Sequence, residues 1–145
     1  MSSSSSTTRI LGPSFTPYSY LQADRIPARA GKDPLVARIL IVEPHADVRT
    51  LFAHVVRRAG HEPVLAELGE AWLDVDAAVI EPGEGHGLAY ARRLRALGLP
   101  VIFASIFPAE HETLALEPAA YFVKPFALSE LEQALESALA RANAA

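Results

Sequence analysis

The sequence contains no cysteine, and this absence excludes several kinds of site at once. Without thiols the chain cannot carry a disulfide framework, a cysteine nucleophile, or a zinc or iron–sulfur centre held by cysteine. No apolar run approaches the roughly 18 residues that a membrane span needs, and the N-terminus lacks the apolar stretch of a signal peptide. The sequence therefore predicts a cytoplasmic protein that does not enter a membrane.

Other motifs that carry chemistry are also missing. The five histidines show no close metal-ligand spacing such as His-x-x-x-His, so we expect no metal site built from them. No glycine-rich motif precedes a Lys-Ser or Lys-Thr pair, and nucleotide hydrolysis is therefore not indicated. We expect a protein that is not an enzyme.

Lysine is scarce, and the charges are unevenly distributed along the chain. Of 13 basic residues, only Lys32 and Lys124 are lysines. Residues 1–38 carry a net charge of +3 and residues 39–145 carry −7, within an overall charge of −4. The acidic body argues against nonspecific binding to nucleic acid, which depends on neutralising phosphates. Nucleic-acid binding through the basic N-terminal segment stays as an alternative, but a solvated linker is the favoured interpretation of that segment.

Residues 1–37 have the composition of a disordered tail. Five serines follow Met1, and prolines interrupt any helix at positions 13, 17, 27 and 34. We therefore predict a disordered, Ser/Pro-rich basic tail over residues 1–37. One stretch, Phe15–Leu21, differs because it contains three aromatic residues. It is either a peptide that docks on a partner or a segment that packs on the chain's own body.

From Arg38 onward, apolar runs of strand length alternate with helical periodicity. Ile39–Val42 is apolar at every position, which suits a strand buried on both faces of a parallel sheet. The helical stripe that follows ends at Gly60, which we predict to be the C′ residue of the helix. Strands are expected at 39–42, 63–66, 77–80, 101–104 and 121–123, and helices at 47–59, 67–73, 88–97, 109–116 and from Ser129, where Glu132 completes a capping box.

This alternation predicts an α/β domain over residues 38–142 with a (βα)5 order of elements. Such units form a doubly wound five-stranded parallel sheet with helices on both faces. The functional crevice of such a sheet lies beyond the carboxyl ends of its strands. Four polar residues come at or just past those ends: Glu43, Glu81, Ser105 and Lys124. We expect their side chains to meet at one rim.

Three segments carry motifs that occur together in a known family. They are Ile39–Arg49, Pro100–Ser105 and Tyr121–Phe126, the last with the sequence Tyr-Phe-Val-Lys-Pro-Phe. In this combination and order, the stretch from about Arg38 to Arg141 resembles the receiver domain of bacterial two-component response regulators. The resemblance implies the flavodoxin-like receiver fold, with a cis peptide bond before the proline that follows Lys124.

The resemblance also implies a phosphorelay. In the family, a histidine kinase donates a phosphoryl group to an aspartate, while an acidic pair and the acceptor carboxylate hold Mg²⁺. A lysine and a Ser or Thr hydroxyl complete the crevice, and an aromatic residue near the last strand acts as the switch. On this pattern Glu81 occupies the phosphoacceptor position. Glu43, Ser105 and Lys124 belong to the receiver crevice, and Tyr121 is the switch and interface residue.

The sequence departs from the family pattern where the chemistry is most demanding. The acidic pair is Glu43-Pro44, and proline has no side-chain oxygen to offer to Mg²⁺, which demands near-octahedral oxygen ligands. We therefore expect Mg²⁺ binding to be weak or absent. The acceptor is Glu81, whose longer arm displaces the attacking oxygen, and a misplacement of ~1 Å can cost ~10²-fold in rate. Ile106, which follows the hydroxyl residue, should narrow access to the crevice.

We therefore expect an atypical, stand-alone receiver, since the chain stops a few residues after the last predicted helix. It would act in phosphorelay-type signalling by protein contact, without conventional Asp phosphorylation. Its partners would be a histidine kinase or a downstream signalling protein, and the resemblance allows a homodimer. Glu81 should pair with Lys124, and this pair either imitates a phosphoaspartate or is only a residual salt bridge. Two alternatives stay open: a functional phosphoacceptor receiver that uses Glu81, and a ligand-binding pseudo-receiver.

Overall fold

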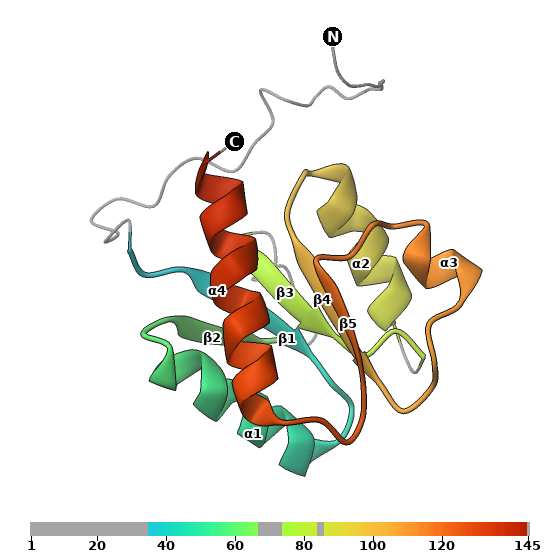
Figure 1. Cartoon of the computed structure of the whole chain (residues 1–145), viewed down its shortest axis with the longest axis horizontal. Coiled ribbons are helices and arrows are strands. Elements are labelled where there is room, and N and C mark those ends of the chain that lie inside the picture. Colours follow the sequence, from blue (N-terminus) through green and yellow to red (C-terminus); the bar gives the residue numbers. More distant parts are fainter. Residues whose placement is uncertain (1–34, 67–73, 84–85, 145) are drawn as a thin grey trace, which may run out of the picture. The chain divides into compact units, whose positions relative to one another are not determined.

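The computed structural model describes residues 35–66, 74–83 and 86–144, which form a five-stranded parallel sheet flanked by helices (Figure 1). The strands lie in the order β2-β1-β3-β4-β5. The elements are β1 (Arg38–Val42), α1 (Ala46–Arg58), β2 (Glu62–Leu65), β3 (Ala77–Ile80), α2 (Gly87–Ala96), β4 (Val101–Ser105), α3 (His111–Leu114), β5 (Ala120–Val123) and α4 (Leu128–Ala144). The predicted doubly wound α/β fold is confirmed.

Some predictions concern residues outside this description. They are the tail as far as residue 34, with its Phe15–Leu21 stretch, and the helix expected at 67–73. The predicted domain boundary at residue 38 likewise stays a prediction, although β1 does begin at Arg38. No helix in the described ranges combines the length and the apolar character that crossing a bilayer requires.

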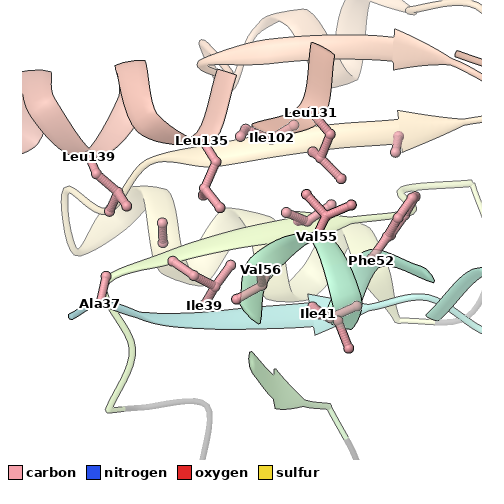
Figure 2. Close-up of a cluster of buried hydrophobic side chains, with 14 residues drawn as sticks. Ala37, Ile39, Ile41, Phe52, Val55, Val56, Ile102, Leu131, Leu135 and Leu139 are labelled. Carbon is pink, nitrogen blue, oxygen red and sulfur yellow. The ribbon is translucent and has the colours of Figure 1, made fainter. Parts of the chain in front are cut away.

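Apart from Arg38 at the start of β1 and Ser105 at the end of β4, the central strands β1, β3 and β4 are apolar, because both faces of the sheet are covered. Successive residues of β1 alternate between two cores: Ile39 and Ile41 pack with α1 and α4, whereas Leu40 packs with α2. Figure 2 shows the core on the α1 and α4 side of the sheet. In it, Leu131, Leu135 and Leu139 of α4 pack against side chains of α1 and of the sheet. These three leucines therefore form the buried face of α4.

Glycine ends two of the helices. Gly60 has a φ of +89°, its N–H donates to the carbonyl of Arg57, and the N–H of His61 donates to the carbonyl of Val56. This is the Schellman arrangement, in which the left-handed C′ residue satisfies carbonyls that the helix leaves free. Gly98, with a φ of +81°, closes α2 in the same way. The prediction for Gly60 is confirmed.

Two helices differ in extent from the sequence pattern. Helix α4 begins at Leu128, so Ser129 lies inside its first turn. The prediction that Ser129 is the N-cap of a capping box is therefore wrong, since the motif requires the helix to begin at Glu130 and it begins two residues earlier. Helix α3 spans only His111–Leu114 within the expected 109–116. The segment between β4 and β5 is thus mostly loop around a single helical turn.

Gly87 opens α2 where the helix begins beside the end of β3. A Cβ atom added to it would lie 1.9 Å from the carbonyl oxygen of Glu81, which is backbone. The helix therefore approaches the strand as closely as the absence of a side chain permits. This contact matters for the site because it fixes the main chain of Glu81.

We predict that Gly87→Ala lowers the free energy of unfolding by about 3 kcal/mol or more, because a backbone atom cannot rotate away from the added methyl. Urea unfolding measures the loss. Gly60→Ala is the matched control, since no atom lies within 4 Å of its Cβ and only its positive φ is strained. That strain should cost about 1 kcal/mol. Equal losses in the two variants would contradict the role given to Gly87.

Candidate functional site

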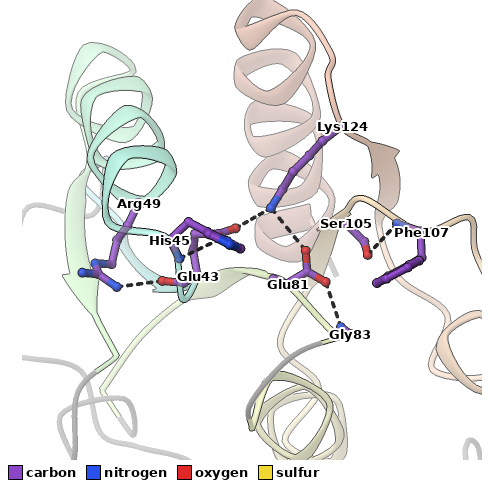
Figure 3. A network of polar contacts seen from close by, with 8 residues as sticks. All are labelled: Glu43, His45, Arg49, Glu81, Gly83, Ser105, Phe107 and Lys124. Carbon is purple, nitrogen blue, oxygen red and sulfur yellow. Dashed lines mark hydrogen bonds and ion pairs between the residues drawn. The ribbon is translucent and has the colours of Figure 1, made fainter.

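The four polar residues predicted at the rim do meet there (Figure 3). Glu43 directly follows β1, Glu81 follows β3 and Lys124 follows β5, while Ser105 is the last residue of β4. Three of them are almost fully buried: Glu43, Glu81 and Ser105 keep 4%, 2% and 1% of their surface exposed. The four side chains therefore form a polar cluster that is largely shielded from solvent. We call these four residues the crevice.

Lys124 joins the two carboxylates of the crevice. Its Nζ donates to Oε1 of Glu43 at 2.7 Å and to Oε1 of Glu81 at 3.2 Å. The predicted pairing of Lys124 with Glu81 is thus present, but the shorter contact is to Glu43. The Lys124–Pro125 peptide bond that follows is cis, as the resemblance implied.

The outer carboxylate oxygens also have donors within the chain. Oε2 of Glu43 accepts from the backbone N–H of His45 at 3.1 Å and lies 3.1 Å from the ring Nδ1 of the same residue. Oε2 of Glu81 accepts from the backbone N–H of Gly83 at 2.8 Å. Arg49 holds the main chain of Glu43 by donating to its carbonyl oxygen at 2.8 Å. Each of the four carboxylate oxygens of the crevice therefore has a protein partner.

The two carboxylates determine the charge state of Lys124. Burial alone would lower the pKa of the Lys124 ammonium, because a desolvated cation is disfavoured. The hydrogen bond and charge of Glu43, followed by those of Glu81, outweigh this effect and hold the pKa of Lys124 above its ordinary value. Lys124 is thus a cation throughout the physiological pH range.

Ser105 and Tyr121 are linked through the loop between them. The hydroxyl oxygen of Ser105 accepts from the backbone N–H of Phe107 at 3.1 Å. The hydroxyl of Tyr121 donates to the carbonyl oxygen of the same residue at 2.9 Å. The ring of Tyr121 packs against Phe103, with 5.9 Å between the ring centroids. Phe107 therefore has its backbone tied both to the crevice and to β5.

Three further residues take part in the site: His45, Gly83 and Phe107. His45 and Gly83 act through backbone N–H groups, which leave no mark in a sequence. Phe107 follows Ile106, and the sequence indicated only that these two residues make the rim more apolar. Ile106 is 53% exposed, and it is Phe107 whose ring lies beside Gly83, next to Glu81. The signal in the sequence for its role in the site was a bulky aromatic residue two positions after Ser105.

The receiver pattern implies that Mg²⁺ binds in this crevice. The oxygen atoms that the crevice residues offer do not fit the ligands that this ion requires. Pro44 offers no side-chain oxygen, and the oxygens of Glu43 and Glu81 already accept from Lys124, His45 and Gly83. A cation would have to displace the Lys124 ammonium to reach them. In the described part of the chain, no three His, Asp or Glu side chains are placed to hold a metal ion.

Solved structures with this architecture include several receiver proteins. A response regulator from Thermotoga maritima aligns with a TM-score of 0.62 over 72% of this chain and 98% of its own, at 17% identity. The chemotaxis protein CheY4 of Vibrio cholerae aligns with a TM-score of 0.61 over 72% and 99%, at 21% identity. A response regulator receiver protein from Burkholderia phymatum aligns with a TM-score of 0.60 over 71% and 94%, at 24% identity.

The chain therefore has the fold of response-regulator receiver domains, as the motifs predicted. At these identities the likeness concerns the fold alone. No protein-family model matches the sequence, and no curated protein does either.

We predict that Lys124→Met lowers the free energy of unfolding by about 3–5 kcal/mol at neutral pH, because it leaves two buried carboxylates without a cation. The sign of the pH dependence follows from the raised pKa of Lys124. Its contribution is complete below the unfolded pKa of about 10.4 and is lost as the pH rises through the higher folded value. The gap between wild type and variant should therefore close at strongly alkaline pH. Urea unfolding between neutral and alkaline pH measures it.

The matched control replaces all three charged groups, as Glu43→Gln, Glu81→Gln and Lys124→Met together. This variant leaves no unpaired buried charge behind, so it should recover part of the lost stability. A Lys124→Met protein as stable as wild type at neutral pH would show that the cluster does not hold the crevice together.

Proposed function

We propose that this chain is an atypical receiver that acts in two-component signalling by protein contact, without conventional phosphorylation. The observation that carries the proposal is the Lys124 ammonium shared by Glu43 and Glu81 inside a buried crevice. Phosphoryl transfer to Glu81 would need that carboxylate free to attack and a divalent cation beside it. Both requirements conflict with the contacts of the crevice. We place the protein in the cytoplasm and assign it no enzymatic activity.

A permanently paired Glu81 gives the receiver one fixed state. The glutamate arm reaches Lys124 from the acceptor position, so an anionic group bound to this lysine is always present. In this proposal Glu81 takes the place that a phosphorylated aspartate would hold, and the crevice keeps one conformation. The notion of a residual, exposed salt bridge fits less well, because the Glu81 side chain is only 2% exposed and its pairing is shielded from solvent.

The surface that we propose for partners lies along the stretch that runs from the end of β4 to the end of β5. In the described residues, seven large hydrophobic side chains are exposed, and four of them belong to this stretch: Ile106, Phe107, Leu114 and Val123. We call these four the 106–123 surface. Exposed apolar residues scattered singly are ordinary, but a gathering of them is typical of an interaction site. A kinase, a downstream signalling protein or a second copy of the chain are the partners that we propose.

We predict that acetyl phosphate with Mg²⁺ leaves the protein unphosphorylated on Phos-tag electrophoresis, under conditions that label an ordinary receiver run beside it. The physical reason is that the acceptor oxygens are engaged by Lys124 and Gly83. Glu81→Gln serves as the matched variant and should behave like the wild type. A Mg²⁺-dependent adduct that is present in the wild type and missing in Glu81→Gln would overturn the proposal. The protein would then be a phosphoacceptor receiver that uses Glu81.

We predict that Leu114→Ser weakens capture of the partner proteins that the wild-type chain retains in a pull-down, because it removes an apolar contact from the 106–123 surface. Leu51→Ser is the matched control, since Leu51 on α1 is 48% exposed and Leu114 is 54% exposed. Loss of a contact residue of this kind typically costs about 1 kcal/mol or more of binding energy at an anchor position. Equal capture by both variants and the wild type would remove this surface from the proposal.

A further inference from the structure

The burial of Glu81 is unusual for a charged residue placed just past the end of a strand. Only 2% of its surface is exposed, so neighbouring groups must cover it on more than one side. Lys124 contacts Oε1 from the β5 side. The other oxygen, Oε2, faces Gly83, whose N–H donates to it at 2.8 Å. Because one backbone N–H cannot shield this oxygen from solvent alone, a further group must cover it.

The ring of Phe107 lies next to the same side of Gly83 as this oxygen. A Cβ atom built on Gly83 would stand 3.1 Å from Oε2 of Glu81 and 3.2 Å from Cδ2 of Phe107. The carboxylate oxygen and the ring therefore both border one point beside Gly83. Figure 3 shows Phe107 beside Ser105 with Glu81 and Gly83 close by (Figure 3). Glycine at position 83 is what lets the ring come this close.

The backbone of Phe107 is fixed by two separate bonds. Its N–H donates to the hydroxyl oxygen of the buried Ser105, and its carbonyl oxygen accepts from the hydroxyl of Tyr121. One bond anchors the residue to the end of β4 and the other to β5. The main chain that carries the ring is thus anchored to both strands.

Phe107 also belongs to the 106–123 surface, since 48% of it is exposed. One side of the residue covers the crevice, and the rest faces outward on the surface proposed for partners. A protein that binds this surface would therefore contact the cover of the crevice directly.

We infer that Phe107 is a lid that closes the crevice over Glu81 and that the Tyr121 hydroxyl holds this lid shut. The inference rests on the proposed function and deepens it, because the lid adds a steric barrier to the contacts by which Lys124 and Gly83 engage the oxygens of Glu81. It also makes the crevice and the partner surface a single unit. Opening the lid should expose the Glu81 carboxylate to small reagents without unfolding the domain.

Carbodiimide labelling of carboxylates tests this in the full-length protein. The reagents are a water-soluble carbodiimide and glycine ethyl ester, and mass spectrometry maps the modified residues. In the wild type, Glu81 should stay protected while Glu117, whose side chain is 84% exposed, is labelled. In Phe107→Ala, Glu81 should be modified at a rate approaching that of Glu117. The product is either the amide with glycine ethyl ester or an internal amide with Lys124. Leu114→Ala, on the same surface but outside the crevice contacts, should leave Glu81 protected.

Tyr121→Phe provides a second variant that removes only the hydroxyl and keeps the packing on Phe103. It should raise the labelling of Glu81 above the wild-type rate and speed hydrogen exchange at the amides of Phe107 and Gly83. Circular dichroism and a cooperative melt establish that each variant is folded, and Tyr121→Phe decides the question if Phe107→Ala is not.

Two results would overturn the lid. One is labelling of Glu81 in the wild type as fast as that of Glu117, and the other is full protection of Glu81 in the folded variants. The labelling does not depend on phosphoryl chemistry, so the two proposals fail separately. Phosphorylation of Glu81 by acetyl phosphate overturns the proposed function. A freely labelled Glu81 without phosphorylation overturns only the lid.

Discussion

The crevice depends on one ammonium group placed between two buried carboxylates. Glu43 and Glu81 are each nearly inaccessible to solvent, and a buried carboxylate is costly unless a cation and hydrogen bonds compensate it. Lys124 is the cation, and backbone N–H groups of His45 and Gly83 supply the remaining bonds. The sheet order makes this possible, because β1 and β3 are neighbours and only β4 separates β3 from β5. Lys124 must therefore reach across the end of β4, where the small residue Ser105 stands.

The same arrangement explains how a receiver fold can tolerate Pro44. A divalent cation would need oxygen ligands that this rim does not offer, and without a cation the two glutamates would repel each other. An internal lysine that contacts both removes the repulsion without any ion from solution. The charge balance of the crevice is then part of the fold. On the proposed function, the protein has replaced a regulated site by a structural one.

Much of this architecture could be predicted from the sequence, because buried parallel strands are apolar at every position and their carboxyl ends share one rim. That rule alone placed Glu43, Glu81, Ser105 and Lys124 together. The details that it could not supply depend on loops of two or three residues. Whether Lys124 lies nearer to Glu43 or to Glu81 is decided by side-chain reach, and the main chain of Phe107 is held by hydrogen bonds to the side chains of Ser105 and Tyr121. The role of Gly87 could not be predicted either, because it depends on how closely the main chain of Gly87 approaches the carbonyl group of Glu81.

A crevice with a partner for every carboxylate oxygen has a consequence for signalling. A ligand shifts a conformational equilibrium only by the difference between its affinities for the two states. To open this crevice, a partner must compensate the loss of charge-assisted hydrogen bonds, each worth about 1.5–3 kcal/mol. A partner that contacts only Ile106, Leu114 and Val123 of the 106–123 surface provides nothing toward that cost. On the proposed function, the surface is therefore presented continuously, and information enters through the presence and concentration of partners. Only a partner that displaces Phe107 itself would gain access to Glu81, which makes that residue the point where a fixed receiver could be converted into a switch.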